Sequence, residues 1–123
     1  MEYFHKITSS RDAVIDFIKN ENADILYGRA FETVGCSKHN SGLFESMKKN
    51  NAVAIFSGHD HVNDYSVMYE GIRLSYSLKS GFGSYWTPEM IGGTTLNINS
   101  KGDVDIENHY YSLPENNWDI VDD

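Results

Sequence analysis

Ala52–Ser57, with the sequence Ala-Val-Ala-Ile-Phe-Ser, leads directly into Gly58–Tyr65, with the sequence Gly-His-Asp-His-Val-Asn-Asp-Tyr. The apolar run is typical of a strand that is buried on both faces, so we expect a strand over Val53–Ser57. In α/β sheets, ligands bind beyond the carboxyl ends of strands, which is where His59 and His61 fall. Imidazole is a common ligand for zinc, iron, cobalt and nickel. The two histidines are therefore a candidate metal site.

The segment before this stretch is predicted to contain a helix and then a long connection. Ser9 can cap the helix, and apolar residues follow it at helical spacing. These apolar residues are Val14, Phe17 and Ile18. Ala23–Asn40 contains glycines and scattered polar residues, and we expect little regular structure there. Loops of this length in a compact domain are often functional.

A second helix is predicted immediately upstream of the apolar run. Asn40 or Ser41 can cap it. Its buried side is expected to consist of Leu43, Phe44 and Met47. A helix followed by a short break and a buried strand is an α/β arrangement, so the predicted fold class is α/β with a mixed sheet and flanking helices.

Downstream of the histidines, apolar and polar residues alternate with a period of two, as in half-buried strands. Glu70-Gly71 separates two such segments and is a plausible two-residue hairpin turn. A second hairpin is predicted farther on, in which Leu96 and Ile98 pair with Val104 and Ile106. Between the hairpins, Gly81–Trp86 is a loop of glycine and aromatic residues. It is either a wall of a substrate site or a turn that carries core aromatics.

Composition and charge limit the classes of function. The chain has 123 residues, which is the size of one domain. Its net charge is −8, from 10 basic and 18 acidic residues, which argues against nucleic acid and anionic membranes as partners. Cys36 is the only cysteine, so no internal disulfide can form. With no signal-peptide pattern and no apolar run near ~20 residues, a cytoplasmic location is expected unless a signal was lost from a fragment.

The block Gly58–Tyr65 resembles the calcineurin-like metallophosphoesterases. The resemblance is to the purple-acid-phosphatase-like branch, which carries a G-H-D-H-x-N-D-[YF] block. Segments on both sides of the block support it and extend the resemblance over roughly residues 28 to 99. These segments are Glu32-Thr33-Val34, Asn40-Ser41-Gly42-Leu43-Phe44, Gly71-Ile72-Arg73-Leu74-Ser75-Tyr76 and Gly81-Phe82-Gly83.

The resemblance implies a fold, a reaction and two site residues. The family fold is a four-layer αββα sandwich that binds two metal ions, commonly Fe, Mn or Zn, and hydrolyses phosphate esters. By the same comparison His59 and His61 are metal ligands, one to each ion, and Asp60 is not a ligand. We expect Asn63 or Asp64 to orient an imidazole from behind.

The chain departs from the family pattern upstream. The family carries D-x-H, G-D-x-x-D and G-N-H-[ED] blocks before the present segment, and this sequence contains none of them. A further family histidine precedes the first helix. Either His5 corresponds to it, or Met1-Glu2-Tyr3 corresponds to the residues just after it and the histidine is missing from this sequence. Residues 1–112 are therefore expected to be the C-terminal portion of a metallophosphoesterase domain, followed by an acidic tail over residues 113–123.

Two functions follow as expectations. The chain is predicted to be a C-terminal fragment of a binuclear-metal phosphoesterase that is inactive by itself, with a phosphate ester as substrate of the full-length protein. The alternative is a non-catalytic scaffold or interaction module with the same fold. Half of a sandwich would leave one sheet face open, so either a homo-oligomer that covers this face or a rearranged packing is also expected.

Overall fold

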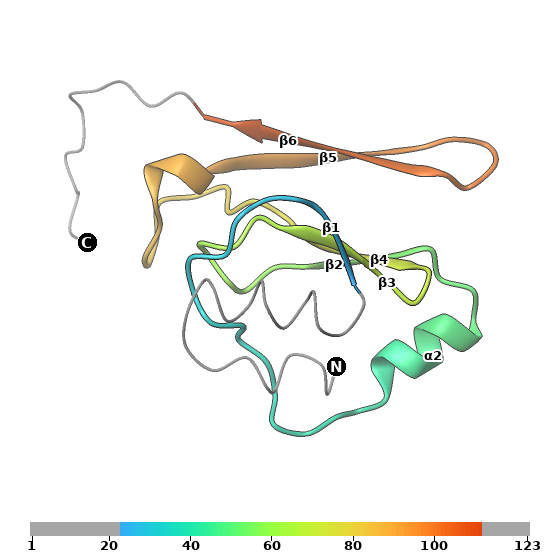
Figure 1. The fold of residues 1–123 in the computed structure, drawn as a ribbon. Coiled ribbons are helices and arrows are strands. Elements are labelled where there is room, and N and C mark those ends of the chain that lie inside the picture. The colour runs from blue at the N-terminus through green and yellow to red at the C-terminus, as the bar shows by residue number, and fades with distance from the viewer. Residues whose placement is uncertain (1–22, 112–123) are drawn as a thin grey trace.

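The computed structural model describes residues 23–111 and places them in two sheets with few helices (Figure 1). The first sheet has the strand order β1-β3-β4-β2, and the second pairs β5 with β6. The elements are β1 Asp24–Tyr27, α2 Leu43–Lys49, β2 Ala54–Ser57, β3 Ser66–Tyr69, β4 Ile72–Tyr76, the 3-10 turn η2 Pro88–Met90, β5 Gly92–Ile98 and β6 Val104–Tyr110. The prediction of a mixed α/β fold is confirmed.

Both predicted hairpins are present. β3 and β4 pair in antiparallel fashion around Glu70 and Gly71, whose φ values are 47° and 80°. Positive φ at both central residues is the signature of a type I′ turn, which matches the twist of the flanking strands. In the second hairpin, the two segments expected to pair do so, with Leu96 opposite Ile106 and Ile98 opposite Val104.

The expectation that β2 is buried on both faces is wrong. Its four residues are all half-buried, and Val53, just before it, is 57% exposed. β2 pairs in parallel with β4 and lies at the end of the strand order, so it is an edge strand of the described sheet. An apolar sequence alone does not show whether a strand is central or at the edge of a sheet, because both kinds of strand can have the same composition.

The predictions for Ala23–Asn40 and for the second helix need correction. β1 lies inside the segment expected to be irregular, and it pairs with β3 although its residues are mostly exposed. Gly42 is the N-cap residue of α2, and the Asn40 side chain accepts a hydrogen bond from its backbone N–H at 2.9 Å. Of the predicted buried side, only Phe44 is buried, against Tyr69 with 5.3 Å between ring centroids, whereas Leu43 and Met47 are exposed.

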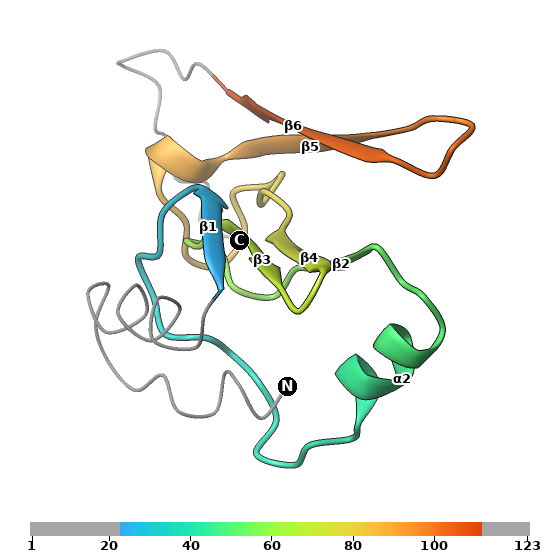
Figure 2. The same cartoon turned by 45° about the vertical axis from the view of Figure 1, so that its right-hand side comes forward.

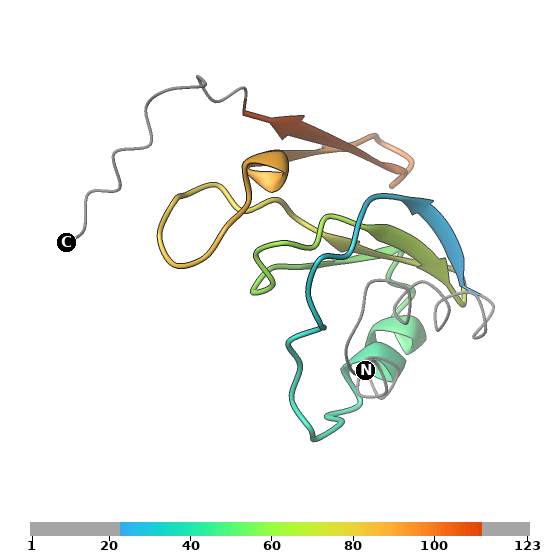
Figure 3. The same cartoon turned by 60° about the vertical axis from the view of Figure 1, so that its left-hand side comes forward.

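The two sheets and the helix form three layers. Figures 1 to 3 show the β5–β6 hairpin on one side of the four-stranded sheet and α2 on the other. The core lies at the sheet, around the buried side chains of Tyr65, Val67 and Tyr76, with Ala23 and Ala30 beside them. The tyrosine rings meet edge to face at 5.0 Å.

Some predicted features lie outside residues 23–111. They are the helix after Ser9, the candidate ligand His5 and the acidic tail over residues 113–123. Within the described part of the chain, no helix has the length and apolar character needed to cross a membrane.

Candidate metal-ligand site

Three loops meet at one edge of the four-stranded sheet, and together they build the site. β1, β2 and β4 run in the same direction, because β2 is parallel to β4 while β1 and β4 are each antiparallel to β3. Their carboxyl ends therefore lie at the same edge, followed by residues 28–35, 58–65 and 77–86. As predicted, His59 and His61 lie just beyond the carboxyl end of β2. The topology also brings two more loops beside them.

Asp60 ties the loops together from a buried position. Its side chain is 2% exposed and accepts hydrogen bonds from the first two loops and from Tyr76, the last residue of β4. The donors are the Gly35 backbone N–H at 3.0 Å, Asn63 Nδ2 at 3.2 Å, His59 Nδ1 at 3.0 Å and the Tyr76 hydroxyl. Burial raises the pKa of the Tyr76 phenol, which therefore stays protonated and donates. A buried carboxylate with this many donors is well compensated for the loss of water.

His59 stands out of the surface on a strained backbone. Its side chain is 77% exposed, and its φ of 80° is a conformation that favours glycine. Gly35 packs directly below, where a Cβ would lie 2.6 Å from His59 Nδ1. Strained non-glycine residues cluster at functional sites, so this backbone supports a role for the exposed imidazole.

His61 is held by Tyr85. Its Nδ1 lies 2.8 Å from the Tyr85 carbonyl oxygen, and the two rings stack with 4.2 Å between centroids and an interplanar angle of 21°. The Tyr85 hydroxyl donates to Glu32 Oε2 at 2.6 Å, and this bond raises the pKa of the phenol. The Gly81–Trp86 loop thus forms a wall against a histidine, while Phe82 and Trp86 pack edge to face at 5.3 Å.

The partners of the two imidazoles decide their tautomers. A carbonyl oxygen and a carboxylate oxygen can only accept, so Nδ1 must carry the proton in both rings. In the neutral imidazole the lone pair then lies on Nε2, which is a metal-ligating atom. Metal-bound histidines commonly donate their other ring N–H to a carboxylate or a carbonyl. His59 and His61 both have this arrangement.

Asn63 and Asp64 do not have the role expected for them, and Asp60 contacts the imidazole instead. The Asn63 side-chain oxygen accepts from the backbone N–H groups of Phe31 and Glu32 at 3.0 and 3.2 Å. Asp64 is fully buried and points away to another group of residues. Asn63 faces the first loop, whereas Asp64 faces Arg29. The sequence does not show which neighbour each side chain meets.

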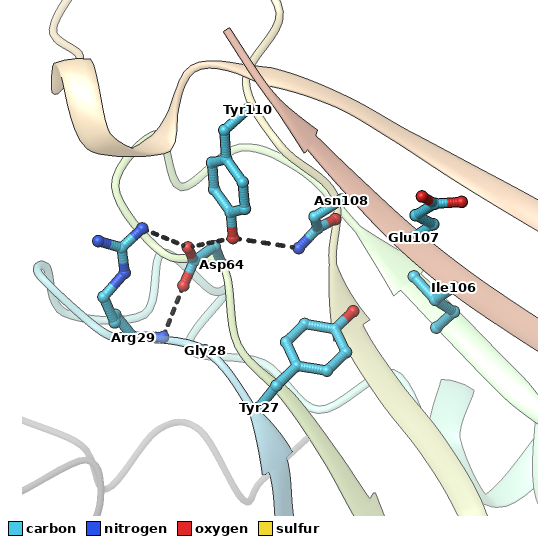
Figure 4. Close-up of a pocket in the computed structure, with 8 residues that line it drawn as sticks. All are labelled: Tyr27, Gly28, Arg29, Asp64, Ile106, Glu107, Asn108 and Tyr110. Atoms are coloured by element: carbon cyan, nitrogen blue, oxygen red, sulfur yellow. Dashed lines mark hydrogen bonds and ion pairs between the residues drawn. The ribbon is translucent and has the colours of Figure 1, made fainter. Parts of the chain in front are cut away.

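Asp64 lies at a pocket between the sheet and the β5–β6 hairpin (Figure 4). Arg29 Nη2 donates to Asp64 Oδ2 at 2.9 Å, and the Tyr110 hydroxyl donates to the same oxygen at 2.8 Å. Arg29 also pairs with Glu89 at 3.1 Å. Burial and the bond to Asp64 raise the pKa of the Tyr110 phenol. These contacts fasten the hairpin to the sheet, and they are structural.

Sequence reasoning singled out the histidines but not the groups that hold them. Glu32, Tyr76 and Tyr85 lie in segments that carry the resemblance or stand out in composition, but sequence patterns assign none of them a role. The glycine-aromatic composition of Gly81–Trp86 was the available signal for Tyr85. For Glu32 the signals were its place in a long connection and in the Glu32-Thr33-Val34 segment of the resemblance.

A complete metal site needs more ligands than this part of the chain provides. Among residues 23–111, no group of three or more His, Cys, Asp or Glu side chains is placed to hold a metal ion. Catalytic zinc sites usually have three protein ligands. Two imidazoles alone fall short of that number, and His5 lies outside the described residues.

The backbone strain at His59 gives a testable stability difference. His59→Gly and His59→Ala both remove the imidazole, but only glycine adopts a φ of 80° without a steric penalty. We expect the free energy of unfolding of His59→Gly to exceed that of His59→Ala by about 1 kcal/mol. Urea denaturation of both variants measures the difference. Equal stability, or a more stable alanine variant, would show that this backbone is unstrained.

Comparisons with known proteins give partial matches. No protein-family model matches the chain, and no solved structure matches it. It is 43% identical over 47 residues to probable inactive purple acid phosphatase 14 of Arabidopsis thaliana, which is 37% of this chain and 12% of the relative. It is 36% identical over 62 residues to probable inactive purple acid phosphatase 28 of Arabidopsis thaliana, which is 50% of this chain and 16% of the relative. Over up to half of its length, the chain is thus similar to proteins named as inactive purple acid phosphatases.

Proposed function

We propose that this chain is a fragment of a purple-acid-phosphatase-like phosphoesterase and that it does not hydrolyse phosphate esters by itself. In this proposal His59 and His61 are ligands in a binuclear metal site of the full-length protein. The supporting observation is that both imidazoles donate Nδ1–H to fixed acceptors, which leaves Nε2 available. The partial similarity to two inactive purple acid phosphatases supports the family and the lack of activity.

The chemistry of the proposed site divides between the metals and the chain. Two bound ions, Fe, Mn or Zn, would activate water and hold the oxygens of a phosphate ester. His59 and His61 would each offer one neutral nitrogen, and Asp60 and the Tyr85 carbonyl would fix the ring orientations. The remaining ligands would come from outside residues 23–111. The chain spans 12% and 16% of the two relatives that it matches, so it represents a small part of such a protein.

The activity and the metal affinity of the 123-residue chain test this proposal together. We expect no hydrolysis of para-nitrophenyl phosphate above the buffer rate with Mn²⁺, Fe²⁺ or Zn²⁺. We also expect weak Zn²⁺ binding by calorimetry, because two imidazoles alone fall short of the usual three ligands. The variant His59→Ala/His61→Ala should lose this binding.

A matched control uses the two other described histidines. His39→Ala/His109→Ala removes the same number of imidazoles from exposed positions and should keep the Zn²⁺ binding. Turnover that disappears in His59→Ala would contradict the inactivity of the chain. Zn²⁺ binding that survives in His59→Ala/His61→Ala, or is absent from the unmodified chain, would contradict the ligand assignment.

A non-catalytic interaction module is the second candidate. Apolar side chains of the hairpin favour it, since Ile98 is 67% exposed and Leu96 40% exposed. Exposed apolar patches often mark interaction surfaces. The expected homo-oligomer belongs to this candidate. A chain without metal affinity and without activity would favour the module, whereas Zn²⁺ binding through the histidine pair favours the phosphoesterase fragment.

A further inference from the structure

We propose that Glu32 and Tyr85 form a positioning clamp on His61, which holds the imidazole as the Nδ1–H tautomer and leaves Nε2 free for a metal ion. This inference rests on the proposed function of the histidine pair. It concerns how the chain fixes the tautomer and orientation of His61 in the absence of a metal ion. None of the motif residues alone predicts it, because the clamp joins three separate segments.

The contacts of the clamp form a ring that starts and ends at His61. The Tyr85 carbonyl accepts from His61 Nδ1 at 2.8 Å, and the Tyr85 ring lies against the imidazole at 4.2 Å. The Tyr85 hydroxyl donates to Glu32 Oε2 at 2.6 Å. The other oxygen, Glu32 Oε1, accepts from the Val62 backbone N–H at 2.8 Å. One carboxylate therefore fixes both the backbone after His61 and the aromatic ring that covers it.

Glu32 is itself held in place from below. Its backbone N–H donates to the Asn63 side chain at 3.2 Å, and Phe31 beside it donates to the Val62 carbonyl at 3.0 Å. The Asn63 amide in turn donates to Asp60. The carboxylate that anchors Tyr85 is thus connected to the same buried network that holds His59. The clamp on His61 and the Asp60 carboxylate below His59 are therefore connected through Asn63.

Tyr85 has features of a residue kept for orientation rather than for stability. It is 50% exposed, so its ring contributes little to the core. Its hydroxyl is nonetheless directed to a carboxylate 53 residues away in the sequence. In free histidine the Nε2–H tautomer is the more populated one, so the carbonyl of Tyr85 must reverse the intrinsic preference of His61. A fixed tautomer favours metal binding, because the ligating nitrogen needs no rearrangement.

The tautomer of His61 is a readout that a purely structural contact would not move. Long-range ¹H–¹⁵N correlation spectra at mildly alkaline pH distinguish the two ring nitrogens of each histidine. We expect His61 of the unmodified chain to be mainly Nδ1–H. Tyr85→Phe keeps the ring and the carbonyl but removes the anchor to Glu32, and should shift His61 towards Nε2–H. Glu32→Gln, which keeps an acceptor, should give a smaller shift.

Two controls separate the clamp from general loosening of the fold. Tyr111→Phe removes the hydroxyl of another half-exposed tyrosine, directly after β6, and should leave the His61 signals unchanged. His39 is exposed and provides an internal reference in every spectrum. Tyr85→Phe should also weaken Zn²⁺ binding by about tenfold, the usual effect of losing a group that orients a metal ligand.

The outcomes distinguish the clamp from the proposed function. A His61 that is mainly Nε2–H in the unmodified chain, or is unchanged in Tyr85→Phe, overturns the clamp. A tautomer shift with a matching loss of Zn²⁺ affinity supports it. A tautomer shift in a chain that binds no Zn²⁺ overturns the metal-ligand assignment and leaves the clamp as a contact that orients His61 without a metal.

Discussion

Asp60→Ala is expected to lower the free energy of unfolding by about 3–5 kcal/mol, because it leaves several buried donors without an acceptor. The Tyr76 hydroxyl and the Asn63 amide both donate to this carboxylate, and both residues are almost fully buried. The Gly35 backbone N–H loses its acceptor as well. With native domains stable by about 5–15 kcal/mol, such a loss would unfold a large part of the population.

Chemical denaturation followed by tryptophan fluorescence measures this effect. Asp105→Ala is the matched control, since Asp105 is exposed on the polar side of β6 and its loss should change stability by no more than about 0.5 kcal/mol. The double variant Asp60→Ala/Tyr76→Phe removes one stranded donor together with its acceptor and should recover part of the loss. Equal stability of Asp60→Ala and Asp105→Ala would show that the buried network is not formed.

Gly28→Ala is expected to prevent the fold described here or to destabilise it by more than about 4 kcal/mol, the range reserved for severe structural conflicts. A Cβ at Gly28 would lie 2.3 Å from Tyr65 Cα and 2.5 Å from the Asp64 carbonyl oxygen. Both are backbone atoms and cannot move aside. The φ of 100° adds a conformational penalty. Asp64 would be displaced from Arg29, and the first loop of the site would separate from the second.

Gly42→Ala separates the two contributions to this effect. Gly42 has a similar positive φ of 75°, but a Cβ there would meet no atom within 4 Å. We therefore expect a cost of only about 1–2 kcal/mol, the conformational penalty alone. Thermal unfolding by circular dichroism compares the two variants. If Gly28→Ala is no worse than Gly42→Ala, the close approach of the backbone to Tyr65 is not present in solution.

Local sequence patterns were sufficient for the hairpins. Glu70-Gly71 between alternating segments predicted a tight turn, and the turn has positive φ at both residues. The segments that carry Leu96 and Ile98 and that carry Val104 and Ile106 pair as expected. Register in a hairpin depends on turn length and on a period of two, and both are readable from neighbouring residues.

Positions that depend on distant segments were not readable. The residues of β1 are mostly exposed. β1 is a strand because its backbone pairs with β3, far along the chain, with Asp24 opposite Met68 and Tyr27 opposite Ser66. Leu43 and Met47 have helical spacing with Phe44, yet they stay exposed because only Phe44 meets a ring from β3. Periodicity predicts which face an element presents, but not what lies opposite that face.

For the site, local sequence was enough to find the two histidines, the strand that leads to them and the resemblance that suggests their role. These depend on residue type and on spacing within one short segment. Contacts between distant segments, seen only in the fold, make Asp60 the support of His59, place Tyr85 and Glu32 around His61, and bond Asp64 to the hairpin. The physical reason is that β1, β2 and β4 run in the same direction, so loops far apart in the sequence meet at one edge of the sheet.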